Sequence, residues 1–154
     1  MRAGETPPDL AILVVEDNPD HLELILMALR ENCDAGRIAS AAGGQEAMDF
    51  LHGRGAHQGR DARKQPRLVI LDVKMNPMDG VAVLKAMRDD PLTQAVPVVM
   101  LTSTVERSEL DKCYEAGANS VVRKSEDYDE LRRKMQRVYD FWVTVNEANR
   151  NSRV

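Results

Sequence analysis

The sequence predicts an α/β protein in which helices cover both faces of a parallel sheet. Two observations lead to this fold class. Five short apolar runs alternate along the chain with five stretches of helical periodicity, which is the pattern of repeated strand–helix–strand units. Several runs are continuously apolar, as expected for strands buried on both faces. Because strand–helix–strand units are right-handed, the five strands should run parallel in one sheet.

Each predicted strand is a short apolar run that ends at a polar residue or a turn. In chain order the strands are expected at residues 10–15, 37–42, 68–72, 96–101 and 119–123. The third run, Leu68-Val69-Ile70-Leu71-Asp72, shows no alternation, and turn residues follow it at once. It is therefore expected to be a central strand, whereas residues 37–42 are the most weakly marked.

The helices are predicted from apolar residues at spacings of three and four. The first begins at an Asn18-Pro19 cap and is expected to end near Asn32. The apolar positions of the five helices are, in order, Leu22, Ile25, Leu26 and Leu29; Ala47, Phe50 and Leu51; Val83, Leu84 and Met87; Leu110, Cys113 and Tyr114; and Leu131, Met135, Val138, Trp142 and Val145. The last set predicts one long helix with a single buried face.

Residues 53–66 form a polar, basic stretch without periodicity. A loop of this length is usually functional or mobile, so it is either a solvated connector or an element that docks a partner. We expect residues 10–148 to be one domain, with flexible tails at 1–9 and 149–154.

Composition and charge exclude several classes of protein. The 154 residues are 43% hydrophobic with a formal net charge of −4, which suits one globular domain and gives no reason to expect a nucleic acid partner. No apolar run approaches the roughly 18 residues that span a bilayer, and the N-terminus does not resemble a signal peptide, so we expect a cytoplasmic protein. Cys33 and Cys113 form no C-x-x-C pair, which argues against a zinc site. Neither a dinucleotide-binding glycine motif nor a P-loop is present.

Four predicted strands end in a polar residue at the same register, namely Glu16-Asp17, Asp72, Thr102 and Lys124. The carboxyl ends of parallel strands lie at one edge of a sheet, so these side chains should converge. Three close carboxylates repel each other unless a cation compensates, and Mg²⁺ is the natural hard cation for such ligands. A lysine and a threonine beside it suit a phosphoryl group. Asp72 is then the candidate nucleophile, because a carboxylate can form an aspartyl-phosphate.

On these residues the sequence resembles the receiver domain of two-component response regulators over about residues 10–147. The resemblance implies a flavodoxin-like (βα)5 fold with strand order 2-1-3-4-5. It also implies that Asp72 is the phosphoacceptor, assisted by Thr102 and Lys124. The Mg²⁺ ligands that it implies are Glu16, Asp17, Asp72 and the main-chain carbonyl of Lys74.

The sequence departs from the family pattern at three places. Asn76 replaces the usual proline, with Pro77 one position later, and Val121 stands at the aromatic switch position. Ser125 replaces the proline that usually follows Lys124 and forms a cis peptide, so this peptide is expected to be either a strained cis bond or a trans bond. A rotamer flip of an aromatic residue at position 121 cannot be the signal. We also hypothesise that the Lys74 side chain shields the phosphoryl group from water and slows dephosphorylation.

The Lys124-Ser125 pair, the long loop at residues 53–66 and Phe141-Trp142 together resemble one subclass, the single-domain regulators that act with bacterial phytochrome histidine kinases. This resemblance implies a sensor histidine kinase of the phytochrome type as partner. It also suggests a homodimer through the fourth helix, the fifth strand and the last helix, including Phe141 and Trp142.

The leading function is phosphorylation-dependent switching of partner binding, and the sequence leaves two alternatives to it. A phosphorelay intermediate that passes the phosphoryl group to another histidine protein remains open, and so does a binding module that works without phosphorylation. An aspartyl-nucleophile phosphatase is disfavoured, because Lys74 stands where those enzymes place a second aspartate. His21, in the first predicted helix, is expected to be solvated or to face the phosphodonor.

Overall fold

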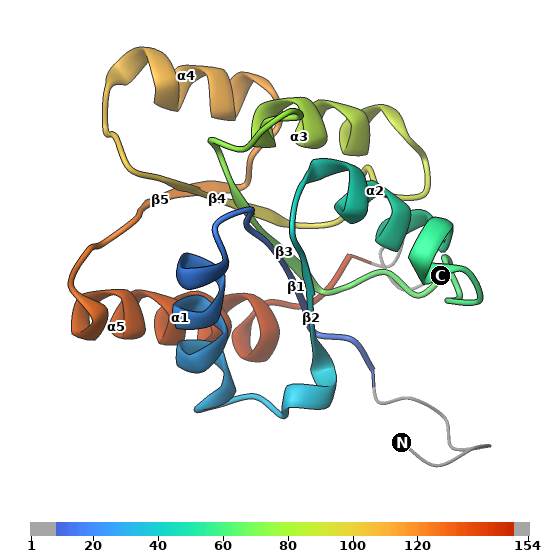
Figure 1. Cartoon of the computed structure of the whole chain (residues 1–154), viewed down its shortest axis with the longest axis horizontal. Helices are drawn as coiled ribbons and strands as arrows, with labels where there is room; N and C mark the ends of the chain where they lie inside the picture. Colours follow the sequence, from blue (N-terminus) through green and yellow to red (C-terminus); the bar gives the residue numbers. More distant parts are fainter. Residues whose placement is uncertain (1–8, 150–154) are drawn as a thin grey trace.

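A parallel sheet of five strands forms the centre of the molecule (Figure 1), in a computed structural model that describes residues 9–149. The strand order is β2-β1-β3-β4-β5, which confirms the predicted flavodoxin-like topology. The strands are β1 (Ile12–Val15), β2 (Ile38–Ala41), β3 (Leu68–Asp72), β4 (Val98–Thr102) and β5 (Ser120–Arg123). Every residue of β1, β3 and β4 is buried, so the continuous apolar runs did mark the inner strands.

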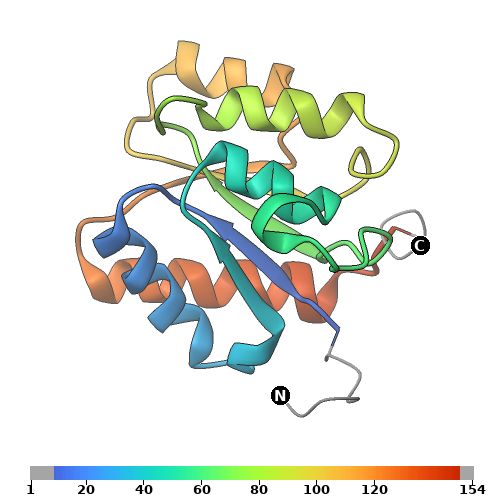
Figure 2. The ribbon, with the colours of Figure 1, turned by 45° about the vertical axis from the view of Figure 1, so that its right-hand side comes forward.

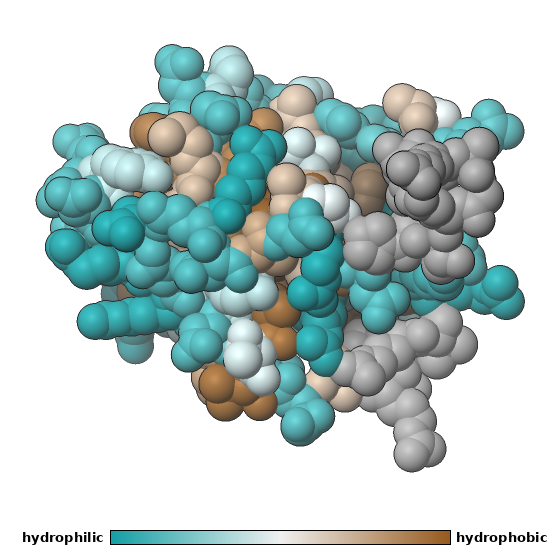
Figure 3. All heavy atoms as spheres, turned by 90° about the horizontal axis from the view of Figure 1, so that it is seen from below, coloured by the Kyte–Doolittle hydropathy of each residue, from teal (hydrophilic) through white to brown (hydrophobic). Residues whose placement is uncertain are grey.

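Helices cover both faces of the sheet. They are α1 (Pro19–Arg30), α2 (Gly44–His52), α3 (Gly80–Asp89), α4 (Arg107–Glu115) and α5 (Tyr128–Tyr139), with the short helices η1 (Ala35–Arg37), η2 (Gly55–His57) and η3 (Asp140–Val145). Helices α1 and α5 lie on one face, and α2, α3 and α4 lie on the other (Figures 1 and 2). The outer side of the α1–α5 layer is largely hydrophilic (Figure 3).

Two hydrophobic cores follow from the alternation of side chains along each strand. On one face Leu13 and Leu71 pack with Val83 of α3, and on the other Ile12 and Ile70 belong to the core of α1 and α5. Strands β1 and β3 are neighbours in register, and Val15 lies opposite Leu71. The residues that follow these two positions, Glu16 and Asp72, are therefore brought to the same edge of the sheet.

The loop at residues 53–66 folds back onto α2 instead of projecting as a bare connector. The Arg60 guanidinium lies 4.2 Å from the centre of the Phe50 ring, and the His57 ring meets the same ring edge to face at 5.0 Å. The buried Gln65 amide donates hydrogen bonds to the carbonyls of Leu51 at 2.8 Å and Ala62 at 2.6 Å. These contacts explain how a polar stretch is held in place, and a docking role for it stays a prediction.

The prediction of one long last helix was wrong in its final turns. Helix α5 ends at Tyr139, and η3 is a π-helix closed by a hydrogen bond from the Asn146 N–H to the Phe141 carbonyl at 2.6 Å. The hydrogen bonds of a π-helix join residues five apart instead of four. The buried face of η3 is therefore rotated relative to that of a regular α-helix. Val143 is therefore buried at 5% exposure, whereas Val145, predicted on the core face, is 59% exposed.

Helix α4 is less buried than its apolar pattern predicts. Cys113 is fully buried, but Tyr114 is 50% exposed, and its hydroxyl accepts a hydrogen bond from the Val121 N–H at 3.3 Å. Because β5 is an edge strand, its outer backbone groups lack a neighbouring strand. Tyr114 thus covers part of this edge instead of filling the core.

Other expectations concern the ends of the chain and its cysteines. The tails predicted at 1–9 and 149–154 lie outside the described residues, apart from Asp9 and Asn149. Both cysteines are buried and free. Among residues 9–149, no helix combines the length and the apolar character needed to cross a membrane.

Candidate functional site

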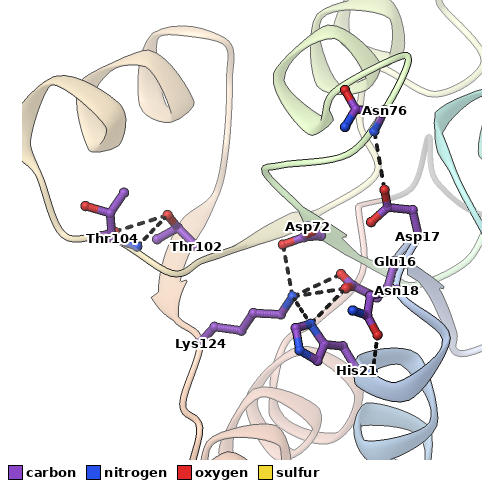
Figure 4. A network of polar contacts seen from close by, with 9 residues as sticks. All are labelled: Glu16, Asp17, Asn18, His21, Asp72, Asn76, Thr102, Thr104 and Lys124. Carbon is purple, nitrogen blue, oxygen red and sulfur yellow. Dashed lines mark hydrogen bonds and ion pairs between the residues drawn. The ribbon is translucent and has the colours of Figure 1, made fainter.

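Side chains from three strand ends meet at the carboxyl edge of the sheet (Figure 4). Glu16 follows β1, Asp72 ends β3, and Lys124 follows β5. The Lys124 ammonium nitrogen lies 3.1 and 3.2 Å from the two Glu16 carboxylate oxygens and 3.3 Å from Asp72 Oδ1. Since β4 separates β5 from β3, the long lysine stem spans one strand to reach the acids.

The acids of this edge form a cluster with the chemistry of a metal site. Glu16, Asp17 and Asp72 each place one carboxylate oxygen within 4.8 Å of the others, and Glu16 and Asp72 are buried. Asp17 Oδ2 also accepts a hydrogen bond from the Asn76 N–H at 3.3 Å, which ties the loop after β3 to the cluster. Three carboxylate ligands at this spacing fit a hard divalent cation.

The electrostatics of Asp72 point the same way. Burial of its carboxyl and the nearby negative charge of Glu16, opposed by Lys124, raise the pKa of Asp72 to about 7. The charge of one lysine is thus not enough to hold the pKa of the buried Asp72 carboxyl at its ordinary value. A bound cation would restore the carboxylate form of Asp72, which is the form that can act as a nucleophile.

The loop after Asp72 passes unusually close to the strand end. A Cβ atom placed on Gly80 would lie 2.1 Å from the Asp72 carbonyl oxygen, so only glycine fits this position. The Gly80 N–H donates to the Val73 carbonyl at 2.8 Å. This contact closes the loop that contains Lys74 and starts α3 beside the acids.

Thr102 lies at the predicted strand end, but its hydroxyl is not part of the cluster. Thr102 is buried at the end of β4. Its Oγ1 donates to the Thr104 carbonyl at 3.1 Å and accepts from the Thr104 N–H at 3.2 Å. Figure 4 shows the two threonines facing each other, apart from the side chains around Lys124. Four of the five residues predicted to converge therefore meet, and the Thr102 hydroxyl does not.

His21 does contact the site, a position that the sequence interpretation left mainly to solvent. Its Nδ1 lies 3.1 Å from the Lys124 ammonium nitrogen and 3.3 Å from Glu16 Oε1. The side chain comes from the first turn of α1, where Asn18 Oδ1 accepts hydrogen bonds from the N–H groups of Asp20 and His21. Its position four residues after Asp17, directly behind a helix cap, was the available signal.

The three departures from the family pattern have defined outcomes. Asn76–Pro77 is the cis peptide found among residues 9–149, so the Lys124–Ser125 peptide is trans. Val121 is partly buried on β5 and packs against the core beneath α4. The position of the Lys74 carbonyl as a metal ligand is not tested by these contacts and stays a prediction.

Residues 12–136 match the family model of the response regulator receiver domain. The chain belongs to this family. Its relatives include the response regulator Rcp1 of Synechocystis sp., which is 27% identical over 141 residues, covering 92% of this chain and 94% of Rcp1. The resemblance predicted from the strand-end residues is thereby confirmed.

Solved structures similar to this receiver include response regulators of phytochromes. The bacteriophytochrome response regulator AtBRR is 38% identical, with a TM-score of 0.68 and coverage of 91% of this chain and 100% of AtBRR. The phosphorylated cyanobacterial phytochrome response regulator RcpA is 26% identical, with a TM-score of 0.82 and coverage of 92% and 99%. Rcp1 itself has been solved in a Mn²⁺-bound form. This receiver is therefore related to the phytochrome-associated regulators, and its acidic pocket is of the kind that binds a divalent metal.

Proposed function

We propose that this receiver accepts a phosphoryl group on Asp72 from a sensor histidine kinase of the bacteriophytochrome type, and that the modification switches partner binding. The observation that carries the proposal is the place of Asp72. Its carboxyl is buried at the end of the central strand, 3.3 Å from the Lys124 ammonium and within the acidic cluster. A carboxylate in such a setting suits nucleophilic attack on phosphorus.

The phosphoryl group passes from the kinase histidine to Asp72 in a single displacement. An oxygen of the Asp72 carboxylate forms a bond to phosphorus while the phosphorus–nitrogen bond of the kinase phosphohistidine breaks. The imidazole leaves with the electron pair and takes up a proton. Lys124, held beside Asp72, provides positive charge for the phosphoryl oxygens as they move.

We assign the divalent cation as Mg²⁺. Glu16, Asp17 and Asp72 would hold it together with the main-chain carbonyl of Lys74, since Mg²⁺ prefers oxygen ligands. Bound there, it supplies positive charge to the phosphoryl oxygens. The Mn²⁺-bound form of Rcp1 supports a divalent ion at this kind of pocket.

The Thr102 hydroxyl would serve as the switch. It is bonded to the backbone of Thr104, so turning it toward a phosphoryl oxygen breaks both contacts and frees the segment that leads into α4. A charge event at Asp72 would in this way shift a two-state element. Because Val121 has no ring to flip, we expect the segment after β4 to carry the change to the surface.

We expect no turnover of foreign phosphoesters at this site. Lys74 occupies the position of the general acid in aspartyl phosphatases, so we propose a phosphoacceptor that assists its own phosphorylation and dephosphorylation. The complete set of acids disfavours a module that works without phosphorylation. We further propose a cytoplasmic location and a homodimer through α4, β5 and the last helix, including Phe141 and Trp142.

Phosphotransfer from purified kinases tests this function. The receiver is mixed with Mg²⁺ and phosphorylated candidate kinases, and wild type, Asp72→Asn and Asp89→Asn are compared. Asp89 is an exposed acid at the end of α3 and serves as a matched control. We expect labelling of wild type and Asp89→Asn but not of Asp72→Asn. Equal labelling of all three would overturn the proposal, whereas phosphoryl transfer onward to a histidine protein would identify a phosphorelay intermediate.

A further inference from the structure

His21 touches the lysine of the site from its outer side. The side chain is 50% exposed, in contrast to the 1% exposure of the Glu16 side chain. Its Nδ1 lies 3.1 Å from the Lys124 ammonium. An ammonium can only donate, so the hydrogen bond from Lys124 requires the tautomer in which Nδ1 accepts and Nε2 carries the hydrogen. In that tautomer the 3.3 Å approach of Nδ1 to Glu16 Oε1 is a contact and not a second hydrogen bond.

The partners of Lys124 differ in what they do once a cation is present. Its other contacts are to the carboxylates of Glu16 and Asp72, and both acids belong to the cluster that fits the metal. A divalent cation competes for the same oxygens and repels the ammonium. Of the Lys124 partners drawn in Figure 4, His21 is the one that lies outside the acidic cluster.

We propose that His21 is a positioning residue for Lys124. Its neutral Nδ1 holds the ammonium at the rim of the pocket when Glu16 and Asp72 are engaged by the cation and the phosphoryl group. The backbone of His21 is fixed by the Asn18 cap, at 3.1 Å from the His21 N–H to Asn18 Oδ1, so the acceptor is in place in advance. A lysine side chain has high rotamer entropy when it is free. If His21 already holds Lys124, less of this entropy is lost when the ammonium binds the phosphoryl group. This inference rests on the proposed function of Asp72.

Phosphorylation by a small donor tests the proposal without the kinase surface. Acetyl phosphate is used at saturating Mg²⁺ on wild type, His21→Leu, His21→Asn and Glu23→Leu. We expect His21→Leu to slow phosphorylation roughly 3- to 10-fold, the size of one typical hydrogen bond, because the His21 side chain is half exposed. Asparagine Oδ1 can replace Nδ1, so His21→Asn should recover most of the rate. Glu23→Leu introduces a leucine at another exposed position of α1, and its rate of phosphorylation should match that of wild type.

Three further measurements separate positioning from a structural effect. Mg²⁺ affinity and thermal unfolding should be the same in His21→Leu and wild type. In a Lys124→Met background, His21→Leu should produce no additional slowing, because the two residues act together. An undiminished effect in that background, or failure of His21→Asn to recover the rate, would overturn the proposal.

A readout on the metal-free protein is independent of phosphorylation. Ring ¹⁵N NMR, at a pH well above the usual histidine pKa, should show His21 with its hydrogen on Nε2, and Lys124→Met should shift the Nδ1 resonance. The opposite tautomer would overturn the inference. If Asp72→Asn is not phosphorylated while His21→Leu reacts at the wild-type rate, only this inference fails. If Asp72→Asn is phosphorylated like wild type, the proposed function itself fails.

Discussion

At the scale of single residues, Asp72 makes stability depend on pH. Its folded-state pKa is raised to about 7 by burial and by Glu16, against about 3.9 in the unfolded chain. Between these values the folded state keeps a proton that the unfolded state has lost. Ionising Asp72 therefore destabilises the metal-free fold progressively as pH rises from about 4 to about 7, after which the loss stays constant.

Asp72→Asn removes this ionisation. In the presence of a chelator we expect its free energy of unfolding in urea to gain up to about 3 kcal/mol on wild type as the pH is raised from about 4 to about 7. Addition of Mg²⁺ at high pH should stabilise wild type and narrow the difference. Asp89→Asn is the control and should show no such pH trend. A constant difference between Asp72→Asn and wild type at every pH would contradict the electrostatic explanation.

A second prediction at the residue scale is that the Lys74 side chain slows loss of the phosphoryl group. Lys74 lies two residues after Asp72 and is exposed, so its charged side chain can occupy the mouth of the pocket. We expect Lys74→Asn to lose its phosphoryl group several-fold faster than wild type, measured as the decay of labelled protein after removal of the donor. Lys85→Asn, at an exposed position on α3, should decay at the wild-type rate. Decay of Lys74→Asn no faster than wild type would remove the shielding hypothesis.

The sequence was informative about backbone positions in the site and less so about side-chain directions. Glu16, Asp72 and Lys124 could be placed together because the ends of parallel strands share an edge. The direction of the Thr102 hydroxyl could not be predicted, since a hydroxyl takes whichever acceptor is near, and here that is Thr104. The contact of His21 depends on how α1 is rotated, which its cap and apolar spacing define only approximately.

At the scale of elements, the end of the last helix shows how a regular pattern can mislead. Apolar residues at spacings of three and four placed Val145 on the core face, but the π-helix η3 places Val143 there. The Arg67 guanidinium donates to the Val143 carbonyl at 2.8 Å and fastens this turn to the start of β3. No spacing rule reports such a tertiary contact in advance.

The two valines provide a direct test of this geometry. We expect Val143→Ala to lower the free energy of unfolding by about 1–2 kcal/mol, because it removes two buried methyl groups. Val145→Ala should change it by less than about 0.5 kcal/mol, as is usual at exposed positions. Urea unfolding of both variants measures the difference. Equal losses, or a larger loss at Val145, would show that a regular helix continues past Tyr139.

At the scale of the whole molecule, the alternation of apolar runs and helical stretches was enough to predict one parallel sheet. The strand order came from the resemblance to receivers, and the observed order β2-β1-β3-β4-β5 agrees with it. Association between two copies of the chain cannot be predicted from this alternation, because it depends on which apolar side chains stay exposed after folding. The helical spacing placed Tyr114 in the interior, although half of its surface is exposed.

The uncovered apolar side chains define the test of the proposed homodimer. Tyr114 and Val105, in α4 and the segment before it, are 50% and 57% exposed, while Phe141 and Val145 in η3 are 50% and 59% exposed. Phe141 is braced by Trp142, whose ring it meets edge to face at 5.0 Å. Rigid aromatic side chains of this kind are common at the centre of interfaces.

We expect wild type to sediment as a dimer at micromolar concentration, and Tyr114→Asp and Phe141→Asp each to shift it toward monomer, because a buried unpaired charge opposes association. Lys85→Asp on α3 is the control and should remain dimeric. A monomeric wild type would contradict the dimer itself. Helices α4 and α5 lie on opposite faces of the sheet (Figures 1 and 2), so a dimer weakened by only one of the two changes would assign the interface to that face alone. A dimer weakened only by Tyr114→Asp would place the interface at α4. Association would then be coupled directly to Thr102 and the segment that follows it, and so to the phosphorylation state of Asp72.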